Sequence, residues 1–344
     1  MSQPTPEQQV EFLMRVQRLL QEGQFVATYK FALLLALADI SVEEADDSGD
    51  AIEISTTKIA EKFVHYYWKQ AVPYVAGTDL NILRQNTGNQ AGILRLVQSA
   101  RSRHGDSLPY LRQNLTAWRK LVKEVERIVC VMPLWKLQTV GRHKLDFLYE
   151  NVEKGRTVSF KPGVAFCLRK FHGIISDLVQ SAWVNYVRRV NLEVLGTTTD
   201  LHEFLFGAER NVLAAVVPVL NDVQHGRCFY CAKDLKRGTI HVDHFIPWSR
   251  YPVDLAHNFV LADTSCNTSK GSRLAATEHL DRWIERNHSH GNDLAVAFSN
   301  VGVIHNLPAS MRVAQWAYTQ AAFSGGLGWK RGEELLPIKR WLQG

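Results

Sequence analysis

The chain has 344 residues, of which 46% are hydrophobic and 22% are charged, and its formal net charge at pH 7 is +6. At ~100–200 residues per domain, this length predicts two compact domains, and the composition excludes a largely disordered protein. The longest apolar run, 31–38, is far shorter than the ~20 residues that span a bilayer. The positive charge permits a nucleic-acid partner without requiring one.

Cysteine usage and the first residues bear on the compartment. The cysteines are scattered and odd in number, which is not the pattern of a disulfide framework. The first residues lack a basic stretch followed by an apolar core, so no secretory signal is visible. We therefore expect a cytoplasmic protein with no membrane association. Its thiols are candidates for metal binding, and they are Cys130, Cys167, Cys228, Cys231 and Cys266.

Hydrophobic spacing predicts a mostly helical first part of the chain. The apolar run lies in the second expected helix, which should be buried on most sides. A hairpin is predicted over 145–161, where two short runs flank a turn over 153–156. We expect one helical domain over residues 1–200. The expected helices cover 6–22, 26–42, 57–70, 79–99, 109–130, 164–194 and 208–222.

Positive charges gather among aromatic residues in one part of this helical region. They could form a surface that follows phosphates. The favoured interpretation is a solvated helix face, because Glu124 and Glu126 interrupt the charges. The residues concerned are Arg101, Arg103, Arg112, Trp118, Arg119, Lys120, Lys123 and Arg127.

Residues 226–273 carry most of the chemistry. Cys228 and Cys231 form a Cys-x-x-Cys knuckle, and Cys266 lies well downstream. Thiolates at this spacing can hold one side of a tetrahedral Zn²⁺ ion. A short β-prone run, 239–242, then leads directly into a polar Asp-His pair. A metal-binding knuckle and a chemically reactive pair therefore lie within one short segment.

The same segment predicts a strand, a loop, a second strand and a helix. A proline and a polar loop follow the first strand, and Asn258 opens the second apolar run. Thr264 or Ser265 could cap a helix that carries Asn267.

This segment resembles the HNH endonuclease family, which has a ββα-metal fold. Four spaced elements carry the resemblance: C-F-Y-C, V-D-H-F-I-P, N-F-V-L and C-N-T-S-K-G. The resulting fold class is mainly α with a small α+β module, namely a helical N-terminal domain and a ββα-metal HNH nuclease domain. The expected domains are 1–200, 201–275 with a leading helix, and 276–344.

The resemblance implies a role for each matching residue. His244 corresponds to the general base that activates water, a task suited to imidazole. Asp243 corresponds to the carboxylate that holds the catalytic cation, and Asn267 completes that metal site. Asn258 corresponds to the asparagine that steadies the loop bearing the base. Oxygen ligands of this kind imply Mg²⁺ or Mn²⁺ as the catalytic ion.

Two basic residues lie near these positions, and one expected cysteine is missing. Lys270 and Arg273 are candidates to clamp phosphate. Where the family usually has the first cysteine of a second knuckle, this chain has Asp263. Three alternatives follow: Asp263 itself binds structural Zn²⁺, His225 or His241 supplies the fourth ligand, or the zinc is lost and the three thiols are small buried hydrophobic groups.

The sequence thus predicts a metal-dependent HNH endonuclease that hydrolyses phosphodiester bonds, with DNA as the expected substrate. The helical domain would determine targeting, bind a partner protein or form a homo-oligomer. This architecture is similar to restriction or anti-phage nucleases. The alternative is a nucleic-acid-binding or scaffold protein with a catalytically silent HNH-like zinc knuckle. Helices expected over 278–286, 308–323 and 333–342 would buttress the nuclease module.

Overall fold

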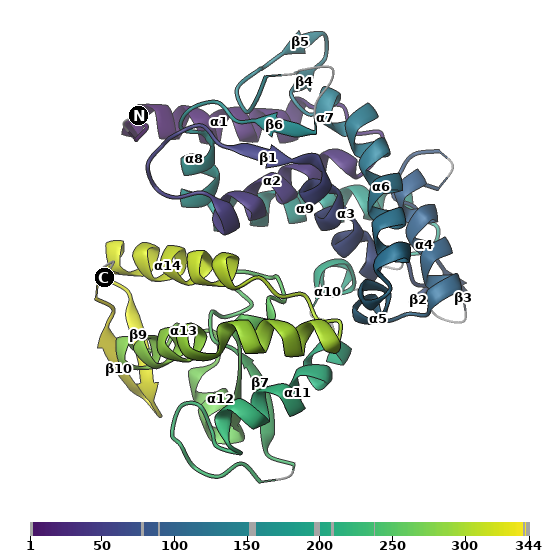
Figure 1. The fold of residues 1–344 in the computed structure, drawn as a ribbon. Helices are drawn as coiled ribbons and strands as arrows, with labels where there is room; N and C mark the ends of the chain where they lie inside the picture. The colour runs from purple at the N-terminus through teal and green to yellow at the C-terminus, as the bar shows by residue number, and fades with distance from the viewer. Residues whose placement is uncertain are drawn as a thin grey trace. The chain divides into compact units, whose positions relative to one another are not determined.

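The structure is a computed structural model that describes residues 3–76, 79–88, 90–150, 156–195, 200–207, 210–236, 238–339 and 341. The chain divides into two compact units, shown in Figure 1. The N-terminal unit comprises Met1–Asp106 and Asn114–Gly207, and the C-terminal unit comprises Ser107–Gln113 and Ala208–Gly344. Each unit is described by itself below.

The N-terminal unit is built mainly from helices, and α2 lies at its centre. Helix α2 is buried from Phe31 to Val42 and packs against α3, α7, α8 and α9. A helix that is apolar on all sides is stable only when neighbours cover it. The helices of this unit are α1 (Pro6–Glu22), α2 (Tyr29–Glu44), α3 (Thr56–Gln70), α4 (Gly92–His104), α6 (Leu115–Val131), α7 (Pro133–Lys136), α8 (Val164–Lys170), α9 (His172–Val190) and α10 (Leu201–Phe206).

Short antiparallel strand pairs complete the unit. The pair β1–β6 joins segments far apart in sequence, with Ile54 opposite Val158. The remaining pairs are local hairpins. The turn predicted over 153–156 falls mostly on 151–155, outside the described residues, but Tyr149 and Phe160 form an antiparallel bridge on either side of it. The strands are β1 (Glu53–Ser55), β2 (Tyr74–Ala76), β3 (Asp79–Asn81), β4 (Thr139–Val140), β5 (His143–Lys144) and β6 (Thr157–Ser159).

The helix predicted over 79–99 is wrong in its first half. Strand β3 and a loop occupy that half, and α4 begins only at Gly92. The buried Gln85 explains the loop, because its carbonyl accepts from the Thr28 amide (3.0 Å) and its side chain accepts from the Trp183 indole (3.1 Å). Polar side chains and glycine in this stretch favour turns, and these tertiary bonds fix them.

Two helices predicted as continuous are each interrupted. The helix expected over 109–130 divides at Asn114, whose side chain caps α6 by accepting from the Ala117 amide (3.1 Å). The helix expected over 164–194 divides at Phe171 into α8 and α9. Directly after that break, the buried His172 bonds Asp39 of α2 (2.8 Å), a contact that periodicity cannot reveal.

The C-terminal unit surrounds a two-stranded antiparallel sheet, β7–β8, with helices. Its core joins Val216 and Leu220 of α11, Phe259 of β8, and Leu294 and Phe298 of α13. This packing fixes the sheet on the helices that flank it. The elements are α5 (Leu108–Gln113), α11 (Arg210–Gln224), β7 (Ile240–His244), η1 (Ala256–Asn258), β8 (Phe259–Asp263), α12 (Thr264–Lys270), α13 (Thr277–Asn300), α14 (Leu307–Phe323), β9 (Leu327–Arg331) and β10 (Glu334–Pro337).

The last part of the chain differs from the prediction in two places. The helix expected over 278–286 continues to Asn300, through a polar stretch, because the buried Arg286 donates to the carbonyls of Phe259 and His257. The helix expected over 333–342 is wrong: Glu334–Pro337 form β10 of the β9–β10 hairpin, and none of the described residues there is helical. Gly332 takes a positive φ (50°) at the hairpin turn, which ends the strand rather than extending a helix.

The fold class predicted from the sequence is confirmed, because helices dominate the described chain and the sheets are small. The region that resembles the ββα-metal fold contains β7, β8 and α12 in that order. Within the described residues, no helix is both long and apolar enough to span a membrane.

Candidate active site

The polar pair Asp243–His244 lies at the end of strand β7. In the β7–β8 ladder, Asp243 is opposite Val260 and His244 is opposite Phe259. Successive strand residues point to opposite faces, so the two side chains diverge and acquire different neighbours. The sheet therefore holds the two polar side chains on opposite faces.

The His244 imidazole is held by a carboxylate from the following loop. Its Nε2 lies 2.8 Å from Oδ1 of Asp254, and the two side chains are 11% and 4% exposed. The ring also packs edge-on against Phe259 and Trp248. A carboxylate facing one ring nitrogen fixes the orientation and the tautomer of a neutral imidazole.

The carboxylate of Asp243 receives two donors on a single oxygen. Oδ2 accepts from the Tyr230 hydroxyl at 2.5 Å and lies 2.9 Å from Nζ of Lys270. Burial, together with the nearby carboxylate, raises the pKa of Tyr230 well above its usual value, which keeps the hydroxyl protonated as a donor. Both of these interactions end on Oδ2, and neither Tyr230 nor Lys270 engages Oδ1.

The placement of Lys270 argues against the predicted phosphate clamp. Its side chain is 0% exposed, and Nζ donates to the His244 carbonyl (2.9 Å) as well as contacting Asp243. Burial lowers the pKa of Lys270, while Asp243 opposes that effect. The other predicted clamp, Arg273, is exposed and donates to the Ser269 carbonyl (3.0 Å).

Asn258 braces the loop that leaves strand β7. Its side-chain oxygen accepts from the Ile246 amide (2.7 Å), and its side-chain nitrogen donates to the Ile246 carbonyl (2.9 Å). Its own carbonyl accepts from the Phe245 amide (2.8 Å). The side chain and backbone carbonyl of Asn258 together fix the two residues that follow His244.

Asn267, the second residue expected to hold the catalytic cation, comes from α12. It lies half-buried on α12, three residues before Lys270. Residues three apart lie on one face of a helix. Asn267 therefore shares the face of α12 from which Lys270 reaches β7. Its backbone carbonyl accepts from the Gly271 amide (3.0 Å) within α12 and its C-cap.

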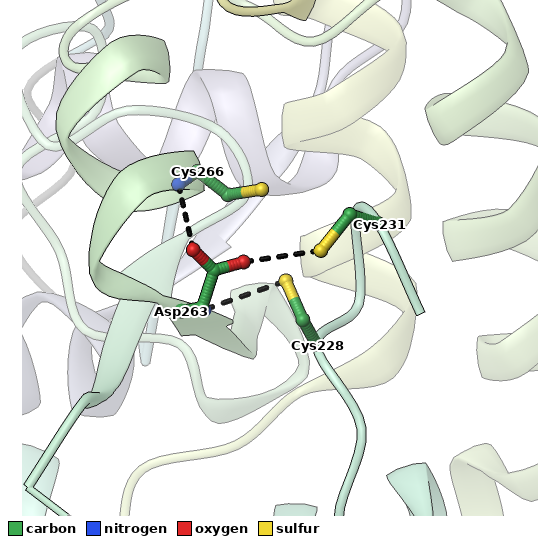
Figure 2. A group of neighbouring side chains, drawn as sticks. All are labelled: Cys228, Cys231, Asp263 and Cys266. Atoms are coloured by element: carbon green, nitrogen blue, oxygen red, sulfur yellow. Dashed lines mark hydrogen bonds between the residues drawn. The ribbon is translucent and has the colours of Figure 1, made fainter. Parts of the chain in front are cut away.

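A second polar cluster lies at the opposite end of β8 (Figure 2). It contains Cys228, Cys231, Asp263 and Cys266, whose ligand atoms all lie within 4.8 Å of one another. A tetrahedral Zn²⁺ site with bonds of about 2.3 Å has its ligand atoms about 3.8 Å apart. Three sulfurs and one carboxylate oxygen thus fit a structural zinc, and they could also hold another soft or borderline cation.

The Asp263 carboxylate has one oxygen for the backbone and one for the thiols. Oδ1 caps α12 by accepting from the amides of Ser265 (2.9 Å) and Cys266 (3.2 Å). Oδ2 accepts from Sγ of Cys231 (3.1 Å), as Figure 2 shows. Burial alone would raise the pKa of Asp263, but these hydrogen bonds hold it far below its usual range. The group is therefore an anion facing the three sulfurs.

The two histidines considered as alternative ligands are not in this cluster. Within the described chain, the four-residue group contains neither His225 nor His241, and Nε2 of His241 instead lies 3.0 Å from the Thr264 hydroxyl. Burial raises the pKa of both Cys228 and Cys266, so these thiols stay protonated until a cation displaces their protons.

Sequence reasoning missed two residues of this region. Tyr230 lies inside the C-F-Y-C motif, where its position between two cysteines could have marked it as a group anchored by the knuckle. Asp254 lies in the polar loop between the two strands, and no motif or residue spacing marks it. Both act through contacts made across the fold.

Comparison with known proteins assigns the two parts of the chain to different families. No curated protein matches the chain. The HNH endonuclease family matches residues 228–276, which confirms the resemblance predicted from the motifs. A family described as a domain of unknown function, DUF8808, matches residues 9–205, more than half of the chain. The chain therefore belongs to the DUF8808 family, and it carries an HNH endonuclease segment in its C-terminal unit.

Proposed function

We propose that this protein is a metal-dependent endonuclease that hydrolyses phosphodiester bonds in DNA, with His244 as general base. The observation that carries the proposal is the His244–Asp254 contact beside Asp243 at the end of β7. With Nε2 engaged by the carboxylate, Nδ1 is the nitrogen that takes a proton from the attacking water. Asp254 keeps the ring oriented and favours the imidazolium that results.

The residues for a catalytic cation are Asp243 and Asn267. Oxygen donors of this type fit Mg²⁺ or Mn²⁺, and Oδ1 of Asp243, which neither Tyr230 nor Lys270 engages, is the oxygen assigned to the ion. When bound, such an ion stabilises negative charge on the phosphate and the leaving oxygen. Tyr230 and Lys270 hold the carboxylate in position, and Asn258 holds the loop that follows His244.

The thiol cluster has a structural part in this proposal. We assign Zn²⁺ to Cys228, Cys231, Asp263 and Cys266, because their donor set fits that ion. Tyr230 lies within the same knuckle and bonds Asp243, so a bound ion would fix the position of the catalytic carboxylate indirectly. A role in restriction or anti-phage defence remains an analogy with nucleases of similar architecture.

One observation favours the alternative of a catalytically silent module. The buried ammonium of Lys270 already neutralises Asp243, so the site is stable without a catalytic ion. Plasmid cleavage in Mg²⁺ or Mn²⁺ separates the alternatives. General bases contribute about 10²- to 10⁴-fold, so His244→Ala should lose activity by that factor. His241→Ala, which changes a half-buried histidine on the same strand, is the matched control. Equal cutting by wild type and His244→Ala would remove His244 from the mechanism.

A further inference from the structure

The N-terminal unit contains a cleft between the start of α3 and one face of α6. The cleft has a volume of about 410 Å³, and all of its lining residues belong to this unit. Four of them carry positive charge: Arg119, Lys123, Arg127 and Arg156. The HNH segment uses none of these residues, so the cleft requires an explanation of its own.

Three of the cations form a regular stripe. Arg119, Lys123 and Arg127 follow at intervals of four on α6, so they lie along one face of the helix. At 1.5 Å per residue the stripe extends about 12 Å. The opposite side of α6 is buried through residues such as Leu121 and Val125. The stripe is therefore held in place along the cleft, with its charged ends exposed to solvent.

The cleft keeps a net positive charge: four cations and two carboxylates, Glu61 and Glu126, line it, which leaves +2. Among the described residues, none of the four cations forms a salt bridge. Glu126 is bonded within the cleft to uncharged groups: its Oε1 accepts from the hydroxyls of Thr56 (2.6 Å) and Thr57 (3.0 Å), which also line the cleft. Like charges held close together without counterions cost free energy, and an anionic partner would relieve that cost.

We propose that this cleft binds the phosphodiester backbone of DNA. A stripe of about 12 Å is longer than a single phosphate group requires and suits successive phosphates on one strand. The exposed Arg and Lys ends suit contacts that depend on charge rather than on base sequence. The choice of DNA as the occupant rests on the endonuclease function proposed above. The α6 stripe would thus be a second nucleic-acid contact, outside the HNH segment.

The test measures binding separately from cleavage. Fluorescence anisotropy with a labelled DNA duplex is run in the His244→Ala background without divalent cations. The triple variant Arg119→Gln, Lys123→Gln, Arg127→Gln is compared with Arg103→Gln, Lys120→Gln, Arg142→Gln. The second set removes the same charge from exposed residues of the same unit that do not line the cleft. Circular dichroism melting verifies that both variants fold.

The cleft variant is expected to raise the Kd at least tenfold, whereas the control variant changes it by less than twofold. The slope of log K against log salt should fall by about 2 to 3, since each phosphate contact contributes about 0.9. Equal effects of the two triple variants, or no effect of the cleft variant, would overturn the proposal. So would tight binding of a mononucleotide at the cleft with duplex binding unaltered, because the occupant would then be a small phosphorylated ligand.

Lysine footprinting gives a local second measurement. Lys120 and Lys123 are both exposed on α6, but only Lys123 lines the cleft. Bound DNA should slow acetylation of Lys123 several-fold more than acetylation of Lys120, as quantified by mass spectrometry. Equal protection contradicts the proposed location. Binding without any cleavage by wild type would leave the cleft proposal standing and reject the endonuclease. If the cleft variant binds and cleaves DNA as well as wild type, the endonuclease proposal stands and the cleft proposal is rejected.

Discussion

The two units each contain a histidine–aspartate pair with the same separation, yet the pairs have different surroundings. His172 and Asp39 lie 2.8 Å apart and are 1% and 2% exposed, and the Tyr66 hydroxyl donates to the same carboxylate at 2.6 Å. His244 and Asp254 are also 2.8 Å apart, but the imidazole is 11% exposed. The first pair is enclosed by helices, whereas the second lies at a strand end beside Asp243.

This contrast shows that the pair alone does not identify a catalytic site. The enclosed pair joins α2 to the start of α9 and contributes to the packing of the N-terminal unit. The more accessible pair has a second carboxylate next to it and belongs to a segment that matches the HNH endonuclease family. Solvent exposure of the imidazole and the groups beside it, rather than the pairing itself, separate a candidate catalytic pair from a structural one.

The largest expected effect concerns the enclosed pair. His172→Ala leaves the buried Asp39 without its imidazole, and breaking a buried pair costs about 3 to 5 kcal/mol. We expect the free energy of unfolding, measured in urea, to fall by that amount while cleavage per folded molecule is retained. His143→Ala, on an exposed strand of the same unit, should alter stability by less than about 0.5 kcal/mol. Loss of cleavage in a fully folded His172→Ala protein would contradict a purely structural role.

His257 extends the comparison through its pH dependence, because its Nε2 bonds a backbone carbonyl rather than a carboxylate. His257 is fully buried and bonds the Gly291 carbonyl (3.0 Å), and burial lowers its pKa from 6.5 to about 4, with smaller contributions from Arg286 and His305. Between those pH values the unfolded chain binds a proton that the folded chain does not, so stability falls as the pH falls.

We expect the contribution of His257 to the free energy of unfolding to fall by roughly 1.4 kcal/mol per pH unit as the pH is lowered from 6.5 to about 4. Above pH 7 this contribution should be constant. Urea unfolding at pH 7, 6 and 5 measures it. His257→Gln should flatten the slope in that window. An identical slope in wild type and variant would show that His257 titrates normally.

The third prediction concerns the accessible pair. Asp254→Asn keeps the size of the side chain but removes the charge that orients His244. We expect the cleavage rate to fall about 10- to 100-fold, or about 1.4 to 2.7 kcal/mol, with unaltered DNA affinity. Asp254→Glu should recover part of the rate, because it restores the carboxylate. A rate unaffected by Asp254→Asn would place this pair alongside His172–Asp39 as a structural contact.

The smallest expected effect tests Asp263 as a metal ligand. Asn is as good an N-cap as Asp, so Asp263→Asn preserves the cap on α12 and removes only the charge that faces the thiols. We expect the affinity for Zn²⁺, measured by competition with a chelating dye, to fall about tenfold, which corresponds to 1.4 kcal/mol. Cys130→Ala lies outside the cluster and should leave the affinity unaltered. Unaltered affinity in Asp263→Asn would require a different fourth ligand.

The sequence predicted the HNH segment because its motifs are local. The Cys-x-x-Cys knuckle, the Asp243–His244 pair and the order of β7, β8 and α12 all follow from short-range patterns. Tyr230 and Asp254 were missed because their roles arise from contacts across the fold. The burial of Lys270, the predicted phosphate clamp, could not be predicted because a seven-residue helix does not reveal from its sequence which face is buried.

The helical part shows the same limit. Helices bounded by clear caps, such as α1 and α3, were predicted nearly residue by residue, because the chain signals their ends locally. The break at Phe171 and the loop around Gln85 were not predicted, since buried contacts with other elements determine them. The break at Asn114 depends on a local cap that hydrophobic spacing alone does not reveal. The long α13 passes through a polar stretch because Arg286 is anchored by carbonyls outside the helix.

The segment Ser107–Gln113 interrupts the N-terminal unit in sequence but belongs to the C-terminal unit. Gln113 donates to the Asn300 carbonyl (2.7 Å), and a Cβ at Gly302 would meet the Pro109 carbonyl oxygen. The backbone therefore passes between the units three times. After a single proteolytic cut following Gly207, α5 would belong to the N-terminal fragment and would still pack in the C-terminal unit, so the two fragments would stay associated. An expression clone starting after that point would lack one of the helices on which its own domain is built.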